Sequence, residues 1–147
     1  MPSYSFLNVN CTLAGPTGLL SLGAGNAVAE EGISIEPTED KNQMTIGADG
    51  KGQHALIASD GATITIRLLK TSPQNKPLML MYNAQAASSA LWGQNVMTIT
   101  DSGRGDINIS QSVAFKKKPT IVYDKAGPMM EWAFDSISTN SVLGGGQ

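Results

Sequence analysis

Short runs in which apolar and polar residues alternate constrain the fold of this chain more than any other feature of its sequence. In the first run, Leu7, Val9, Cys11 and Leu13 are each separated by one polar residue. Successive side chains of a β-strand point to opposite faces, so this pattern predicts a strand with one buried face. Similar runs predict further strands at residues 33–36, 41–48, 54–58, 62–69, 95–100, 106–114, 120–123 and 130–137.

Turn sequences between these runs predict which strands are neighbours. Asp49-Gly50 is a dipeptide that favours a tight hairpin. Residues 101–105 (DSGRG) predict a hairpin loop between two of the strands. Residues 125–128 (KAGP) predict another, which would pair the strand at 120–123 with the strand at 130–137.

One segment has the pattern of a helix. Residues 71–73 (TSP) supply a capping hydroxyl followed by a proline, which is typical of a helix start. Residues 78–82 then carry an apolar stripe, and the small residues 86–89 (AASS) end it. Proline is tolerated only in the first helical turn, so Pro77 moves the expected start a residue or two beyond Pro73.

Together these elements predict a mainly β protein. We expect an antiparallel β-sandwich or partly closed barrel with one flanking α-helix. At 147 residues the chain should form a single domain over residues 1–147. Residues 18–31 are rich in glycine and are predicted to be irregular, and the C-terminal residues 143–147 are predicted to be mobile.

The composition argues against several classes of function. Charged residues make up 15% of the chain and the net charge is −2, whereas a dedicated nucleic-acid binder normally has a basic excess. Glycines interrupt the most apolar stretch, residues 13–29, which falls short of the roughly 20 apolar residues of a membrane helix. The N-terminus lacks the pattern of a signal peptide. We therefore expect a soluble protein that is intracellular where it is made.

The residues needed for catalysis or metal binding are scarce. Cys11 is the one cysteine and His54 the one histidine, too few for an internal disulfide or a structural zinc site. A thiol beside an imidazole can act as a nucleophile, but Cys11 lies on the apolar face of a predicted strand, where a small buried side chain is expected. The sequence thus predicts a protein that is not an enzyme and has no catalytic, cofactor-binding or metal-binding residues.

Several segments resemble a family of tail structural proteins from contractile-tailed bacteriophages. The resemblance is carried by residues 28–36 (VAEEGISIE), 38–42 (TEDKN), 44–50 (MTIGADG), 67–73 (RLLKTSP), 82–85 (YNAQ) and 115–117 (FKK). It extends over nearly the whole chain, from Tyr4 to Gly144. On these residues the chain is similar to the tail tube proteins of such phages.

This resemblance implies a structural role in the virion. Proteins of this family form hexameric rings that stack into a hollow tube inside a contractile sheath. Genomic DNA passes down the tube during ejection without specific binding. The implied partners are further copies of the chain, the tail sheath protein, and baseplate, tail initiator and terminator proteins. The subunit would be made and assembled in the cytoplasm of the host bacterium, and no membrane is involved.

The resemblance also suggests roles for acidic and basic residues. Glu36, Glu39, Asp40 and Asp49 are expected to line the channel or its rim, where negative charge would repel DNA phosphates. The alternative is that these acids form salt bridges between rings with Lys41, Lys51 or Arg67. Lys116, Lys117 and Lys118 are expected to face the sheath. The loops near residues 15–31 and 37–53 should contact neighbouring subunits or the next ring.

Other functions stay open at this point. The same fold would suit another tail or baseplate component, or the tube subunit of a secretion system. From a different class, a small β-sandwich module that binds a sugar or peptide is the alternative. Such a module needs an aromatic groove, and only 5% of the residues are aromatic.

Overall fold

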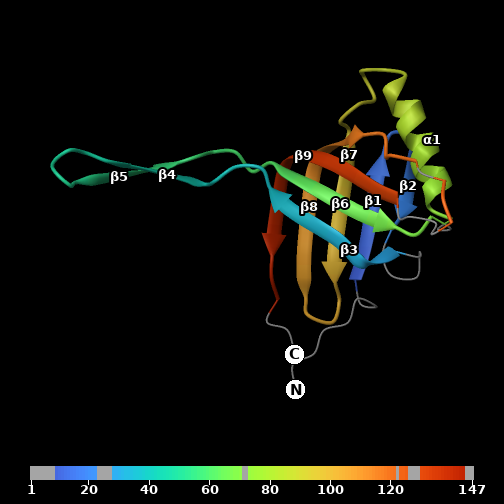
Figure 1. Ribbon diagram of the computed structural model, residues 1–147, viewed down its shortest axis with the longest axis horizontal. Coiled ribbons are helices and arrows are strands. Elements are labelled where there is room, and N and C mark those ends of the chain that lie inside the picture. The colour runs from blue at the N-terminus through green and yellow to red at the C-terminus, as the bar shows by residue number, and fades with distance from the viewer. Residues whose placement is uncertain (1–8, 23–27, 71–72, 122, 126–129, 145–147) are drawn as a thin grey trace.

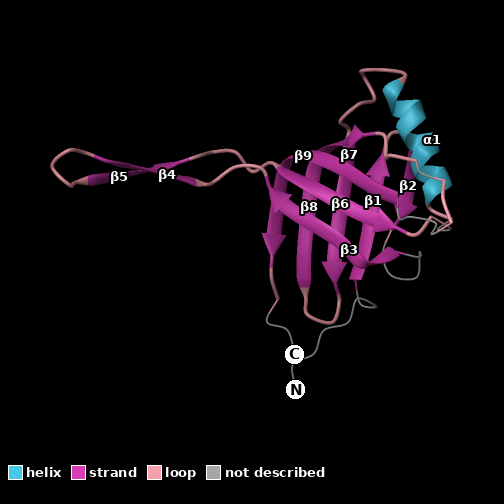
Figure 2. Ribbon diagram, viewed as in Figure 1, coloured by secondary structure: helices cyan, strands magenta, loops and turns pink. Residues whose placement is uncertain are grey.

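In the computed structural model, residues 9–22, 28–70, 73–121, 123–125 and 130–144 are described below. The strands are β1 (Val9–Gly15), β2 (Gly18–Ser21), β3 (Val28–Pro37), β4 (Asn42–Ile46), β5 (Gly52–Leu56), β6 (Ala62–Leu68), β7 (Asn95–Asp101), β8 (Asp106–Lys117) and β9 (Met130–Val142). The helix is α1 (Asn75–Ala86). The fold is thus mainly β with one flanking helix, as the sequence predicts (Figure 2).

Seven of the strands form one antiparallel sheet in the order β2-β1-β7-β8-β9-β6-β3. The long strand β9 joins its two halves, because residues 130–136 pair with β6 while residues 133–142 pair with β8. The sheet bends there, so that β6 and β3 cross in front of β8, β7 and β1 (Figure 1). The sequence predicts an antiparallel sandwich or partly closed barrel. The structure has two packed layers, but they belong to one open antiparallel sheet with β2 and β3 as its end strands.

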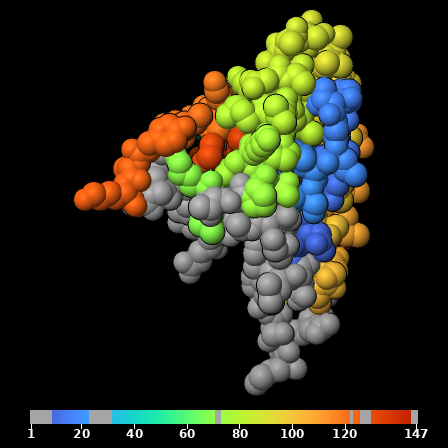
Figure 3. Space-filling view, turned by 90° about the vertical axis from the view of Figure 1, so that its right-hand side faces the viewer, coloured from blue at the N-terminus to red at the C-terminus, as the bar shows by residue number. Residues whose placement is uncertain are grey.

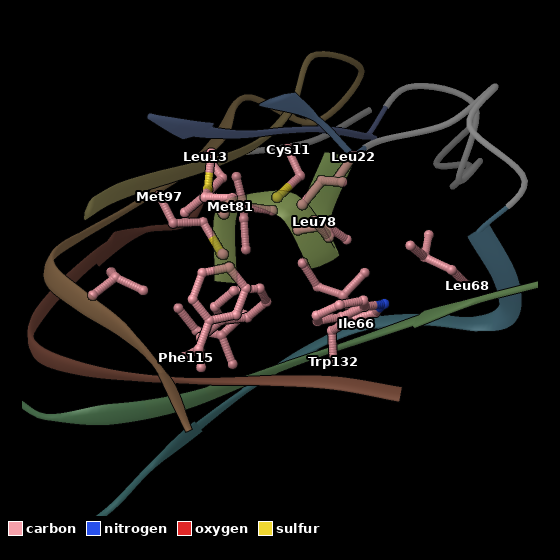
Figure 4. Packing of buried hydrophobic residues seen from close by; sticks show 14 of the residues in the cluster. Cys11, Leu13, Leu22, Ile66, Leu68, Leu78, Met81, Met97, Phe115 and Trp132 are labelled. Atoms are coloured by element: carbon pink, nitrogen blue, oxygen red, sulfur yellow. The ribbon is translucent and has the colours of Figure 1, made fainter. Parts of the chain in front are cut away.

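The core lies between these two layers (Figure 4). Buried and half-buried residues alternate along β6, where Ile64 and Ile66 point inward, as they do along β7. Phe115 of β8 is at the centre of an aromatic cluster, with its ring centroid 4.9 Å from that of Phe134 and 6.0 Å from that of Trp132. The alternation that predicted the strands therefore also identifies the residues that hold the layers together.

Helix α1 begins at Asn75, two residues after Pro73. The proposed capping hydroxyls of residues 71–72 lie outside the described residues. Asn75 instead fixes the start of the helix: its Nδ2 donates to the carbonyl oxygen of Leu69 (3.0 Å), and its Oδ1 accepts from Trp132 Nε1 (3.1 Å). Pro77 is the third helical residue, a position whose N–H would have no partner within the helix. A proline is therefore accommodated there.

Two of the predicted elements are wrong. Residues 120, 121 and 123 are not in a strand, and residue 122 is outside the described part of the chain. Residues 133–136 of β9 have β8 on one side and β6 on the other, so along this part of β9 neither edge is available to a strand at 120–123. Residues 18–31 are also not irregular throughout, since β2 forms there and β3 already begins at Val28. Gly32, at a φ of 62°, lies within the register shift between Val28 and Ile33 of β3, where a glycine tolerates the positive φ.

Candidate functional site

A two-stranded hairpin projects from the body of the molecule (Figure 1). We call residues 39–59, which contain β4 and β5, the arm. The strands pair antiparallel, with Met44 opposite His54, and the tip turn is closed by hydrogen bonds from Gly47 N to Lys51 O (2.8 Å) and from Gly50 N to Gly47 O (3.0 Å). Every residue of β4 is exposed, so the arm has no core within this subunit.

One face of the arm carries large apolar side chains, and no described part of the subunit covers it. The register places Met44, Ile46 and Leu56 on the same face, together with the hydrogen-bonded pair Asn42 and His54 (Nδ2 to Nδ1, 3.0 Å). Met44 is 59% exposed, Ile46 60% and Leu56 84%. A lone two-stranded hairpin is at best marginally stable in water, so this face is suited to contact with another molecule.

The root of the arm, in contrast, is fastened to the body. Lys41 Nζ lies 2.7 Å from Asp60 Oδ1, and the two side chains are half exposed. Lys41 Nζ also donates to the carbonyl oxygen of Ser59 (3.3 Å), and the carbonyl of Asp60 accepts from Thr139 N on β9 (2.9 Å). The direction in which the arm leaves the sheet is thus fixed at its base.

The four acids expected at the channel lie in two different parts of the molecule. Glu36 is exposed on the outer face of β3, opposite Thr63 of β6. Glu39 and Asp40 lie at the root of the arm, whereas Asp49 lies in its tip turn and accepts from Lys51 N (3.1 Å). The structure therefore does not bring the four carboxylates into one cluster.

Two further acids share the outer face with Glu36 and were not singled out from the sequence. Asp135 of β9 lies opposite Thr63 and accepts from its Oγ1 (3.2 Å), so Glu36, Thr63 and Asp135 form one row across three strands. Glu131 of β9 pairs with Arg67 of β6 (Nε to Oε2, 3.0 Å). The alternation of the strand contains the signal, because Trp132 and Phe134 point inward and residues 131 and 135 must point outward.

The basic residues are placed as follows. Lys116, Lys117 and Lys118 are exposed at the end of β8, where the register shifts between Phe115 and Lys117. Of the bases considered as partners between rings, Lys41 and Arg67 have acidic partners within the subunit, Asp60 and Glu131 respectively. Those two contacts involve none of the four acids expected at the channel.

Cysteine and histidine are far from forming a reactive pair. Cys11 is fully buried in the core, and burial raises the pKa of its thiol to about 12, whereas His54 is exposed on the arm. Among the described residues, no group of three or more His, Cys, Asp or Glu side chains could hold a metal ion. In the same part of the chain, no helix is long and apolar enough to cross a membrane.

A second apolar surface is a groove between β2 and α1, which we call the helix groove. Its volume is about 340 Å³, and it is lined by Thr17, Gly18, Leu19, Leu20, Pro77, Leu80, Met81 and Ala84. Leu19 is 69% exposed and Leu80 60%. Figure 3 shows α1 beside the blue residues of β1 and β2 on this side of the molecule. None of the lining residues is charged.

Two buried side-chain amides beside this groove link α1 to β7 and to the β1–β2 turn by hydrogen bonds. Gln85 of α1 and Asn95 of β7 are fully buried and donate to each other's side-chain oxygens, at 2.8 Å in both directions. Gln85 Nε2 also donates to Thr17 Oγ1 in the β1–β2 turn (3.1 Å), and Asn95 Nδ2 to the carbonyl oxygen of Val113 (3.1 Å). The helix is thereby fixed to the layer that contains β1, β2 and β7.

The chain was compared with known proteins. A protein-family model described as the bacteriophage PhiTE tail tube protein matches residues 1–144. No curated protein matches the chain. A solved structure with a similar fold is a chain of the anti-feeding prophage (AFP) baseplate, determined by cryo-electron microscopy with six-fold symmetry imposed. The two are 8% identical with a TM-score of 0.58, and the match covers 97% of this chain and 96% of the other.

Proposed function

Because the chain belongs to the family of the bacteriophage PhiTE tail tube protein, we propose that it forms the tail tube itself, as hexameric rings stacked around a channel that genomic DNA crosses during ejection. The observation that carries the proposal is the family match over 144 residues. The chain is accordingly a structural component of a phage tail, and the rings, the stacking and the DNA passage are the proposed part.

The fold and surfaces of the subunit support assembly into rings. Both ends of the sheet, β2 and β3, are edge strands within the described part of the chain. An unpaired edge is a template for pairing with another chain, and a closed ring would cover it. The fold neighbour comes from a baseplate determined with six-fold symmetry, the symmetry that a hexameric ring requires. The arm supports stacking, because the apolar side chains on one of its faces are exposed to solvent in the described part of the subunit.

The outer face of β3, β6 and β9 is the best candidate for the channel wall. It carries Glu36 and Asp135 in one row, and Glu131 beside Arg67. Acids exceed bases on this face, so it would repel DNA phosphates and keep the moving duplex from binding. Glu39, Asp40 and Asp49, which lie on the arm, would then line the rim or the space between rings.

Other assignments follow from the same proposal. Lys116, Lys117 and Lys118 would face the sheath. Residues 15–31 and the arm would contact neighbouring subunits. Near the C-terminus, Gly144 N donates to Asp106 Oδ1 (2.8 Å). The tail predicted to be mobile is residues 143–147, and residues 145–147 of it lie outside the described residues.

Electron microscopy of the purified protein at high concentration tests the proposal. We expect rings of six subunits and hollow tubes of indefinite length, and a reconstruction of the tubes would show whether Glu36 and Asp135 face the channel. Addition of a preformed baseplate provides the control for templated assembly. A protein that remains monomeric with such a template would contradict the proposal.

A second candidate is a component of the baseplate, which is favoured by the source of the fold neighbour. The same images separate the two, because a baseplate component would form assemblies of fixed size rather than tubes that lengthen with concentration.

A further inference from the structure

We propose that the apolar face of the arm of one subunit docks in the helix groove of a second copy of this chain. The inference rests on the proposed assembly into a tube and specifies one of its contacts: Met44, Ile46 and Leu56 on one copy, and Leu19, Leu80 and Met81 on the other. Each surface is present in every subunit, so the contact can repeat along an assembly.

The arm has the properties of a segment that packs against another chain. Its three large apolar side chains share one face and are each more than half exposed. The opposite face carries the small residue Ala55 together with Gln43, Thr45 and Gln53, which are polar and compatible with water. Burial of an apolar side chain is favourable by roughly 1.5–3 kcal/mol relative to leaving it exposed. A partner that contacts only the face with Met44, Ile46 and Leu56 would therefore stabilise the hairpin.

The helix groove has the properties of a receptor. Leu19 and Leu80 form its exposed apolar walls, while Met81, which also lines the groove, is buried in the subunit. The Gln85–Thr17 hydrogen bond links the helix to the β1–β2 turn, so the groove exists before anything binds. A preformed site loses little conformational entropy on association.

The positions of the two surfaces identify the occupant as a second copy. The arm leaves the sheet on one side of the molecule, while α1 and β2 lie on the other (Figure 1). The arm therefore cannot reach the groove of its own subunit. A contact between two different surfaces of the same chain is heterologous, and it generates rings or open filaments rather than a closed dimer.

The charged residues that flank the two uncharged surfaces are opposite in sign. The arm carries Glu39, Asp40 and Asp49 against Lys41 and Lys51, and is acidic by one charge. Helix α1 carries a single charged residue, Lys76, which is exposed and adjacent to Pro77 in the groove wall. An acidic arm is therefore attracted to this groove rather than to the acidic outer face of β3, β6 and β9.

Cross-linking tests the contact directly. Ile46→Cys and Leu80→Cys variants are mixed and treated with a short bismaleimide. The native Cys11 can remain, because it is fully buried and protonated at neutral pH. We expect a covalent dimer in the mixture at several times the yield of either variant alone. Equal yields in the mixture and in the separate variants, or a dimer mainly between two Ile46→Cys subunits, would overturn the proposal.

Charge variants provide an independent readout. Ile46→Asp and Leu80→Asp should each raise the protein concentration needed for assembly by about tenfold or more, which corresponds to roughly 1.4 kcal/mol per contact. Thr45→Asp on the opposite face of β4 and Asn83→Asp on the exposed side of α1 are matched controls that add the same charge outside the contact. Circular dichroism verifies that all four fold. Equal assembly by variants and controls would overturn the proposal.

The outcomes also separate this contact from the tube itself. The wild-type protein could form hollow tubes while the cysteine variants give no cross-link and the charge variants assemble normally. That result would refute the docking and leave the proposed function in place. A strong cross-link between Ile46→Cys and Leu80→Cys subunits, with assemblies that never become rings or tubes, would support the docking and refute the proposed function.

Discussion

The buried amide pair of Gln85 and Asn95 predicts an unusual result in a double-mutant cycle. Asn95→Leu removes both hydrogen bonds between the two side chains and the bond to the carbonyl oxygen of Val113. Gln85 Nε2 keeps Thr17 Oγ1 as a partner, but Gln85 Oε1 and the Val113 oxygen each lose a donor. We expect that adding Gln85→Leu to this variant will not destabilise it further.

The magnitude follows from counting the groups left without a partner. An unsatisfied buried donor or acceptor costs about 1–3 kcal/mol, so Asn95→Leu, with two of them, should lower the free energy of unfolding by about 2–6 kcal/mol. Gln85→Leu leaves only Asn95 Oδ1 without a hydrogen-bond donor, and should lower the free energy of unfolding by about 1–3 kcal/mol. The double variant leaves only the Val113 oxygen without this donor and should also cost about 1–3 kcal/mol. The coupling energy between the two changes is then about 2–6 kcal/mol, on the order of the larger single effect.

Urea unfolding followed by tryptophan fluorescence measures these differences, at concentrations where sedimentation shows a monomer, since assembly would add to the apparent stability. Gln94→Leu, which removes an exposed amide next to Asn95, is the matched control and should change the stability by less than about 0.5 kcal/mol. If the double variant lost the sum of the two single effects, the reasoning from unpaired groups would be refuted.

Four further predictions concern other parts of the subunit. Cys11 should react with a thiol reagent at pH 8 only after unfolding, and rapid reaction of the folded protein would contradict its burial. Its thiol pKa is raised from 9.0 to about 12, so the thiol ionises first in the unfolded state, and stability should fall between about pH 9 and 12 more steeply than in Cys11→Ala, at up to about 1.4 kcal/mol per pH unit. Trp132→Phe should lower the free energy of urea unfolding by more than about 1 kcal/mol, because it removes the bond to Asn75 and also leaves unfilled space at a fully buried position. The effect should be smaller by about 1 kcal/mol in an Asn75→Ala background, and equal effects in both backgrounds would contradict this. Asp60→Asn, which breaks a half-exposed ion pair with Lys41, should change the free energy of unfolding by less than about 1 kcal/mol, and a loss of several kcal/mol would show that the root of the arm is less hydrated than the structure indicates.

Much of the fold could be predicted from the sequence because burial follows the period of each element. The alternation in residues 62–69 predicts β6 almost to the residue, and the turn at 101–105 predicts the β7–β8 pair. Strand β2 could not be predicted, because its four residues are exposed or half-buried and include a glycine. The strand expected at 120–123 is wrong because local β propensity does not report whether a neighbouring strand has a free edge.

The candidate surfaces could be predicted only in part. Met44 and Ile46 alternate with polar residues as Ile64 and Ile66 do, and this pattern predicts a strand with one buried face in each case. In β6 that face lies in the core, whereas in β4 it is exposed. Sequence periodicity identifies which face of a strand is apolar. It does not show whether that face is buried within the same subunit or against another molecule. The helix groove could not be predicted at all, because Thr17 and Leu80 are distant in the chain.

The uncovered arm has a consequence for the timing of assembly. Residues held in place only by a partner lose their conformational freedom at the moment of association, and this loss opposes the first encounter of two free subunits. In the proposed tube, a subunit that adds to an existing ring would meet several neighbours at once, so the same ordering would be offset by more contacts. Formation of the first ring would then be slow and its extension fast, which would keep newly made subunits dispersed until a starting platform is present.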